Sequence, residues 1–463
     1  MSFSDRFVKT FRMLLPNPFT IAVLLTAFTF LLALILTKPT TAGIGSYSLE
    51  LLTHWEDGLW GTNYLEFEVQ MMLMLVLGHS LALTRPVSLI IDKALHYCHD
   101  TKSAAVWIAL FTMSVGFINW GLGLVFGAIF VRKFGEKATA QNIKVNYGLI
   151  GAAGYSGMMV WHGGFSGSAP VKVAEEGHLH SLMEGIYTTE QIAGLPVAIP
   201  LSETILSPMN ITIGLMLICL VPLFFYWMGK QVKTEKINIK SEAPISKSKT
   251  EQLIGAEHLD RSRIVAYFFS IVIIFYVSYR LFEGGAADFS VINPNYINLT
   301  LLGLAILLHG RFINFLNSIN QAITGVSGIL IQFPLYFGIM GIMKGSGLVY
   351  DFSEFFVSVS SASTYPFFTF LSAGIVNVFV PSGGGQWMVQ GPILIQAAEM
   401  LNIPLQKCIM ALSYGDQLTN MLQPFWALPL LGIAKLSARQ IIPYTFALML
   451  LGGLIFIIGL AIF

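Results

Sequence analysis

Asp416 is the acidic residue that lies deepest inside an apolar stretch of this sequence. It belongs to residues 414–429, whose other polar members include Gln417, Thr419, Asn420 and Gln423. An ionisable group at membrane depth is costly and is a functional candidate by default. We therefore predict that Asp416 ligates Na⁺ or carries a coupling proton. The alternative is that Asp416 lies at the mouth of the segment and only caps a helix.

A second apolar stretch, residues 155–170, contains four glycines, three serines and a proline. Proline breaks the helical hydrogen-bond ladder, and unwound backbone is tolerated at membrane depth only where protein or a water-filled cavity covers it. Freed N–H groups attract anions, and freed carbonyl groups attract Na⁺. We predict that Ser166 and Ser168 bind substrate and that His162, rather than His79, is the better candidate for a proton carrier. The alternative is a kink that serves helix packing.

Two further apolar stretches, 104–131 and 366–400, have polar residues and glycines at their middle. The first contains Asn119, Gly121 and Gly123, and the second contains Asn377, Ser382, Gly383, Gly384 and Gly385. Consecutive glycines leave backbone amides uncovered, so N–H groups and a helix N-terminus could bind a carboxylate without arginine. The alternative is that these glycines only form tight turns. A Na⁺ ion could also bind near Asn119, Asn377 and Asp416.

The absence of basic residues from the apolar segments suggests the charge of the substrate. No arginine or lysine lies in the core of any of them. A dicarboxylate, tricarboxylate or phosphate would more often be bound by a nearby cation. The pattern favours a small anion with a single charge, and a dicarboxylate is the alternative.

Composition indicates the class of protein that must position these groups. Of the 463 residues, 55% are hydrophobic and 11% are charged, against about 25% charged in soluble domains. The chain is therefore predicted to be an all-α polytopic membrane protein, not a soluble enzyme. The net charge of +1 gives no support to nucleic-acid binding.

Segment length and charge predict a topology. A crossing helix needs about 20 apolar residues. Nine crossings are predicted, at residues 19–37, 65–84, 146–170, 209–229, 264–282, 296–309, 323–343, 408–434 and 441–463. Stretch 104–131, with arms of about 14 residues and basic flanks, is predicted as a re-entrant hairpin from the cytoplasm, and 366–400 as one from outside. The predicted cytoplasmic segments hold 21 of the 26 lysines and arginines, which places the N-terminus inside and the C-terminus outside.

The two halves of the chain show similar motifs at similar spacings. Tyr155 lies 36 residues after Asn119, and Tyr414 lies 37 after Asn377. This order predicts an inverted repeat, an architecture of secondary transporters. The predicted units are residues 1–229 (first repeat), 230–263 (cytoplasmic linker), 264–290 (connecting helix) and 291–463 (second repeat).

A protease interpretation is weaker. Residues 164–167 match the GxSG pattern of intramembrane serine proteases, but no partner histidine can be placed, and intramembrane aspartyl proteases need two membrane aspartates. We expect no enzyme activity. The sequence contains no Walker A motif, so ATP-driven transport by this chain is not expected.

The whole chain resembles the short-chain fatty acid transporter family. The resemblance is densest in four strings, at residues 117–125, 163–168, 380–385 and 423–429. It implies uptake of acids such as acetoacetate and butyrate across the bacterial cytoplasmic (inner) membrane, with H⁺ or Na⁺ as the coupling ion and no other cofactor. The expected partners are a small monocarboxylate, membrane lipid and a second copy in a homodimer.

The family is grouped with the ion transporter superfamily, whose relatives have paired re-entrant hairpins and elevator-type motion. By that resemblance, each hairpin tip and its broken helix would enclose the substrate together. This implies two groups of substrate-binding residues: Asn119 with Ser166 and Ser168, and Ser382 with Thr419 and Asn420.

Overall fold

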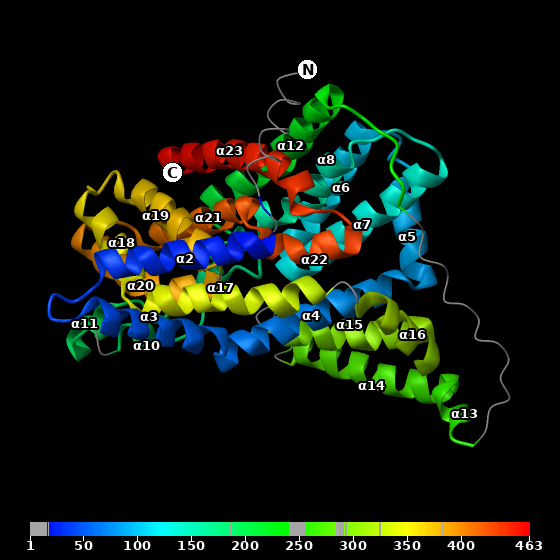
Figure 1. Cartoon of the computed structure of the whole chain (residues 1–463), viewed down its shortest axis with the longest axis horizontal. Helices are drawn as coiled ribbons and strands as arrows, with labels where there is room; N and C mark the ends of the chain where they lie inside the picture. Colours follow the sequence, from blue (N-terminus) through cyan, green and yellow to red (C-terminus); the bar gives the residue numbers. More distant parts are fainter. Residues whose placement is uncertain are drawn as a thin grey trace.

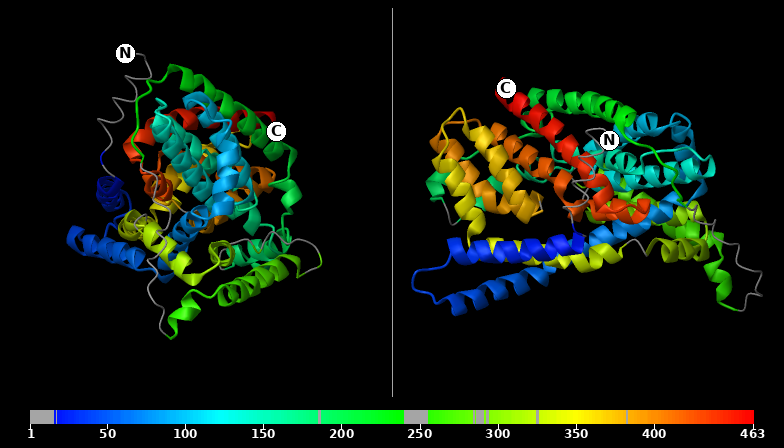
Figure 2. Two further views of the ribbon diagram at one scale, coloured as in Figure 1. Left: turned by 90° about the vertical axis from the view of Figure 1, so that its right-hand side faces the viewer. Right: turned by 45° about the horizontal axis from the view of Figure 1, so that its top comes forward.

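The computed structural model describes residues 16, 18–184, 187–239, 255–283, 285, 291, 294–323, 326–381 and 383–463. This part of the chain is helical, and its one β-type contact is an isolated bridge between Val145 and Glu235. The predicted all-α class is therefore confirmed. The helices form two layers, which Figure 2 shows in its right-hand view.

The first layer, here called the frame, contains seven helices. These are α2 (Pro18–Leu36), α3 (Ile44–Leu59), α4 (Thr62–Ala82), α14 (Arg263–Phe282), α15 (Pro294–His309), α16 (Phe312–Ala322) and α17 (Ser327–Gly345). α17 packs against α2, α3 and α4, and α4 packs against α15 and α16. The contact of α3 with α17 is close because a Cβ atom at Gly341 would lie 2.1 Å from the carbonyl oxygen of His54. Helix α3 and its contact with α17 were not predicted.

The second layer, here called the core, contains two helical hairpins. The first consists of α6 (Thr101–Ile118) and α7 (Trp120–Ala140), and the second of α19 (Tyr365–Phe379) and α20 (Gly383–Met400). Asp100 caps α6 with a reciprocal capping box to Ser103. The Asn119 side chain accepts from the Leu122 N–H at 3.0 Å and so begins α7 after the turn. Figure 1 shows α6 and α7 in its right half and α19 and α20 in its left half.

The core also contains the two broken helices that the sequence predicts. The first is α8 (Tyr147–Tyr155), η1 (Ser156–Met159), η2 (Trp161–Gly163) and α9 (Ser168–Lys172); the second is α21 (Leu405–Thr419), η6 (Asn420–Leu422) and α22 (Pro424–Ala434). The second break follows from Pro424, because the residue before a proline avoids helical angles. Gln423 has φ −89° and ψ 114°. α8 packs on α6, and α21 packs on α19.

The remaining helices surround these elements. They are α5 (Arg85–Leu95), α10 (His178–Met183), α11 (Thr189–Gly194), η3 (Leu201–Glu203), α12 (Pro208–Gln231), α13 (Glu257–Asp260), α18 (Leu348–Ser358) and α23 (Ala438–Ile462). α12 packs on α6 and α23, and α10 packs on α20. Since α23 also packs on α8, helices from both halves of the chain share the core. The division into two repeats stays a prediction.

Five helices in the described residues are long and apolar enough to cross a membrane: Phe19–Leu36, Thr101–Ile118, Pro208–Gln231, Arg263–Phe282 and Ala438–Ile462. Four of them coincide with predicted crossings, while the total of nine stays a prediction. The prediction that each arm of the first hairpin has about 14 residues is wrong. Helix α6 has 18 residues and α7 has 21. The difference arises because both helices continue into polar sequence, at Lys102 in α6 and at Arg132 in α7.

Candidate functional site

The two helix breaks meet inside the core. The backbone N–H of His162, in the first break, donates to Oε1 of Gln417 at 2.9 Å. The hydroxyl of Tyr155 donates to the carbonyl oxygen of Asn420, in the second break, at 2.8 Å. All four residues are at most 1% exposed. The structure therefore brings together two polar stretches that lie more than 200 residues apart.

His162 and Asp416 face each other at this meeting point. Nδ1 of His162 lies 3.7 Å from Oδ2 of Asp416, and the two side chains are 0% and 1% exposed. Nε2 of His162 accepts the Ala169 N–H at 3.3 Å, so in the neutral ring the proton is on Nδ1, beside Asp416. Neither carboxylate oxygen has a hydrogen-bond partner in the described part of the chain. Asp416 is therefore deeply buried, and the alternative that it caps a helix at a mouth is wrong.

Asn377 connects the second hairpin to the second break. Its Nδ2 donates to the Asp416 carbonyl oxygen at 2.7 Å, to Thr419 Oγ1 at 2.9 Å and to Asn420 Oδ1 at 3.0 Å. Gln423 Nε2 donates to the Asn377 carbonyl oxygen at 2.5 Å. Oδ1 of Asn377 and Oε1 of Gln423 are buried without a partner among the described residues. These two amide oxygens and the Asp416 carboxylate are thus buried oxygens without a hydrogen-bond donor, on residues of the second hairpin and the second break.

The tip of the first hairpin lies against the first break. Ser166 Oγ accepts a hydrogen bond from the backbone N–H of Trp120 at 2.9 Å. The backbone N–H of Phe165 donates to the Phe117 carbonyl oxygen at 2.8 Å. Gly164 permits this contact, since a Cβ atom there would lie 2.3 Å from the same carbonyl oxygen. Asn119 is buried beside this contact.

The remaining glycines of the first hairpin serve close packing. A Cβ atom at Gly121 would lie 2.2 Å from Sδ of Met74 in α4, and one at Gly123 would lie 2.8 Å from Cα of Gly116. The structure thus gives both a packing role, and their predicted role in substrate binding stays a prediction.

The tip of the second hairpin also lies against the first break. A Cβ atom at Gly383 would lie 2.9 Å from Ser168 Oγ and 3.0 Å from His162 Cε1. The space beside Gly384 is open, and Gly385 continues the first turn of α20. Ser382, predicted to bind substrate, lies outside the described residues. Within the described part of this hairpin, Asn377 contacts both Thr419 and Asn420, and the Gly374 carbonyl oxygen accepts from Thr419 Oγ1 at 3.0 Å.

Two buried polar residues were missed by sequence reasoning. Asn210, in α12, donates to the carbonyl oxygens of Gly163 at 2.8 Å and Ile205 at 2.6 Å, and accepts from the Tyr414 hydroxyl at 3.0 Å. Its signal was a lone amide near the start of an apolar run. Glu68, near the start of the predicted crossing 65–84, is 3% exposed in α4, and its Oε2 has no hydrogen-bond partner among the described residues. This burial arises because α4 packs on five other helices, α5, α7, α15, α16 and α17.

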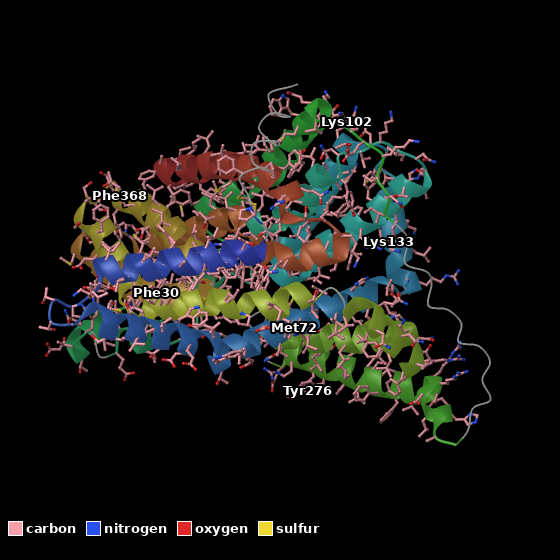
Figure 3. All side chains as sticks on the ribbon, in the orientation of Figure 1. Phe30, Met72, Lys102, Lys133, Tyr276 and Phe368 are labelled. Atoms are coloured by element: carbon pink, nitrogen blue, oxygen red, sulfur yellow. The ribbon has the colours of Figure 1, made fainter. Side chains whose placement is uncertain are left out.

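Positive charge lies away from this site. The described residues of the breaks and hairpin tips include no lysine or arginine. Figure 3 shows Lys102 and Lys133 in the right-hand part of the molecule, where α5 also lies. Several apolar helices, with a buried polar site where two of them are broken, describe a multi-pass membrane protein.

Comparison with known proteins identifies its family. The model of the short chain fatty acid transporter family matches residues 2–463. A protein of Escherichia coli (strain K12) is 37% identical over 465 residues, which cover 100% of this chain and 98% of the relative. One of Haemophilus influenzae (strain ATCC 51907 / DSM 11121 / KW20 / Rd) is 36% identical, with 98% of both chains covered. The names of both assign them provisionally to short-chain fatty acid transport.

The chain belongs to the short-chain fatty acid transporter family. Its members are transporters and not enzymes, as the sequence predicts. Among solved structures, the YdaH transporter of Alcanivorax borkumensis aligns with a TM-score of 0.45 at 14% identity, covering 96% of this chain and 97% of that one. MtrF of Neisseria gonorrhoeae, from a class of antimetabolite efflux pumps, aligns with a TM-score of 0.39 at 12% identity, covering 98% and 96%.

Proposed function

We propose that the chain is a secondary active transporter. It moves a short-chain fatty acid anion, such as butyrate or acetoacetate, across the bacterial cytoplasmic membrane together with H⁺ or Na⁺. The observation that carries this proposal is the buried Asp416 carboxyl group, which faces His162 where the two helix breaks meet. Family membership supports the class of substrate.

The coupling ion is proposed to bind at Asp416. A carboxylate that is 1% exposed and lacks a hydrogen-bond donor is unfavourable as an isolated anion. Binding H⁺ neutralises it directly. Binding Na⁺ neutralises it with the help of the unpaired oxygens of Asn377 and Gln423. The Asn377 hydrogen bonds fix the Asp416 backbone and the Thr419 and Asn420 side chains, so the second break is held in place before either ion binds.

The substrate carboxylate is proposed to bind beside this ion, at the hairpin tips. α20 begins at Gly383, and the N–H groups of Gly383 and Gly384 lie at the N-terminus of this helix, which attracts an anion. Ser166 and Ser168 supply hydroxyl groups from the first break. A dicarboxylate is less favoured, because no described residue of the site is a lysine or arginine.

The arrangement of the ends supports the predicted topology. Figure 1 shows α5, α13 and α16 at the right-hand end and α11 and α18 at the opposite end. The first set lies in or beside segments predicted to be cytoplasmic. We propose that α6–α7 enters the membrane from the cytoplasm and α19–α20 from outside, as re-entrant hairpins of two inverted repeats. The N-terminus is then cytoplasmic and the C-terminus outside.

The exposed apolar face of α14 is proposed to contact lipid. Ile264, Phe268 and Phe275 are 81%, 72% and 72% exposed. Such side chains in water would be unfavourable, and a membrane covers them. The homodimer that the family resemblance implies remains a proposal.

Uptake of labelled butyrate into proteoliposomes tests the function. A Na⁺ gradient and a pH gradient are imposed separately, with empty liposomes as the control. We expect accumulation under one of the two gradients and loss of gradient-driven accumulation in Asp416→Asn. Thr300→Val, which removes a local hydrogen bond to the Tyr296 carbonyl oxygen in α15, should behave like the wild type. Absence of uptake by folded wild-type protein under both gradients would refute the proposal.

A further inference from the structure

Three tryptophans that the proposed mechanism does not use meet beside His162 and Asp416. We call Trp120, Trp161 and Trp426 the tryptophan cluster. The ring centroid of Trp120 lies 5.0 Å from that of Trp426 and 6.2 Å from that of Trp161. Each ring is at least nine-tenths buried. They come from three separate elements: the start of α7, the first break and the start of α22.

The indole N–H group of Trp161 is a hydrogen-bond donor that no described residue of the protein pairs with. Its Nε1 is buried and has no acceptor among the described residues. A buried donor without an acceptor is destabilising, so it indicates a missing partner. The ring stacks on that of His162, with centroids 4.3 Å apart and planes at 21°. The unused donor therefore belongs to a residue in direct contact with the proposed coupling site.

The second hairpin completes the enclosure of this cluster. A Cβ atom at Gly383 would lie 2.9 Å from Cη2 of Trp161. The tip of this hairpin thus lies directly against the indole ring. All four elements of the site, two breaks and two hairpin tips, consequently meet at the tryptophan cluster.

We propose that the tryptophan cluster is the binding compartment for the fatty acid. The indole N–H of Trp161 donates to the substrate carboxylate. The rings of Trp120 and Trp426 contact the hydrocarbon chain of the substrate. This assignment rests on the proposed function and names the residues that recognise its substrate. An indole combines an N–H donor with a large apolar surface, which matches a ligand with one carboxylate and a few methylene groups. The ring centroids lie 5.0–6.4 Å apart, so a short hydrocarbon chain should be preferred over a longer one.

The N–H of Trp161 is tested by Trp161→Phe, which keeps an aromatic ring and removes the donor. The KM for butyrate uptake in proteoliposomes should rise about 10- to 100-fold, as expected for loss of a hydrogen bond to a charged group. Trp55→Phe is the matched control, because Nε1 of Trp55 is also buried without a partner but lies against Gly338 in the frame. Its KM should stay within about twofold of the wild type. If the KM of Trp161→Phe also stays within about twofold of the wild-type KM, the assignment is overturned.

The rings are tested by the chain length of the substrate. In Trp120→Phe and Trp426→Phe the smaller ring leaves room, so hexanoate should compete with labelled butyrate better than it does in the wild type. Unchanged competition by acetate, butyrate and hexanoate in both variants would overturn the role of the rings. This series also decides the proposal if Trp161→Phe fails to fold, as judged by thermal unfolding of the purified protein.

The experiment separates two kinds of failure. If wild-type protein takes up no butyrate, the proposed function fails. If wild-type protein transports butyrate and the tryptophan variants resemble it, the function stands and the tryptophan compartment fails.

Discussion

Asp416 differs from a structural acid in what surrounds it. A structural carboxylate inside a protein is usually paired with a cation or accepts hydrogen bonds. Neither oxygen of Asp416 accepts a hydrogen bond in the described chain, and the ionisable group that faces it is His162, with Nδ1 3.7 Å from Oδ2. Its backbone is by contrast well fixed, since its carbonyl oxygen accepts from Asn377. The side chain is therefore held in place while its charge is left for a ligand. The sequence identified this residue from its polar setting alone.

At the same scale, Asn210 should be essential for the stability of the first break. Asn210→Leu leaves the Tyr414 hydroxyl and two carbonyl groups without their partner. Each unpaired buried group costs about 1–3 kcal/mol, so unfolding should become easier by at least about 2 kcal/mol. Thermal unfolding in detergent measures this. Thr300→Val serves as the control, and an equally small shift for both variants would contradict the role of Asn210.

The cap of α6 should give a pH-dependent contribution to stability. Partial burial raises the pKa of the Asp100 carboxyl, but hydrogen bonds from Ser103 and the charge of Lys102 outweigh it, so the pKa is below its ordinary value of 3.8. The stabilisation is therefore present above pH 3.8 and is lost as pH falls through the lowered pKa. Asp100→Ala should cost about 1 kcal/mol at pH 7.

Unfolding of the wild type and Asp100→Ala is compared at pH 7 and below the pKa. The difference should disappear at low pH. Ser262→Ala, which removes the neutral cap of α14, should lose a similar amount at both pH values. A cost of Asp100→Ala that does not change with pH would contradict the prediction.

At the scale of elements, the second hairpin is positioned by close backbone contact. α19 packs on α21 because Gly415 has no side chain, and a Cβ atom there would lie 2.1 Å from the Phe370 carbonyl oxygen. The backbone of Gly415 adjoins Asp416, and Asn377 is carried by α19. The packing of these two helices thus determines the distance between Asn377 and the carboxyl group.

Gly415→Ala should therefore separate α19 from α21. Overpacking of this kind costs about 1–3 kcal/mol, and butyrate uptake should fall with it. Gly453→Ala is the matched control, because a Cβ atom at Gly453 would first meet Leu418 Cδ2 at an ordinary 3.4 Å. Thermal unfolding and uptake are measured together. If the two variants have the same thermal stability and the same butyrate uptake, the contact of Gly415 with α19 does not control the position of the second hairpin.

At the scale of the whole molecule, the site lies entirely in the core. The frame contacts it through α4, which packs on α7, and α17, which packs on α19 and α22. The two layers are therefore joined by few helices, while the breaks and hairpin tips are joined to one another by hydrogen bonds. We expect transport to require movement between the layers, not within the core.

A disulfide between α4 and α7 should stop transport. Gly78 and Val125 suit it, since a Cβ atom at Gly78 would lie 3.4 Å from Cβ of Val125, close to disulfide geometry. In a variant without Cys98, Cys219 and Cys408, the pair Gly78→Cys and Val125→Cys should lose uptake on oxidation and regain it on reduction. The control pair, Gly303→Cys and Ile273→Cys, joins two frame helices at 3.2 Å. Undiminished uptake by the oxidised test pair would exclude movement between these helices.

The sequence alone determined the class, the breaks and the polar residues of the site. These features follow from local chemistry: apolar length predicts membrane helices, proline and glycine predict the breaks, and a lone acid among apolar residues indicates a function. Asp416, His162 and Asn377 were therefore predictable as individual residues.

Only the tertiary structure decided which of them meet. The His162–Asp416 pair, the three tryptophans and Asn210 come from helices distant in sequence, and contacts of this kind leave no local pattern. The burial of Glu68 was missed for the same reason, because the helices around α4 determine it. The physical cause is that helix breaks are encoded by neighbouring residues, whereas a shared binding site depends on how whole helices pack.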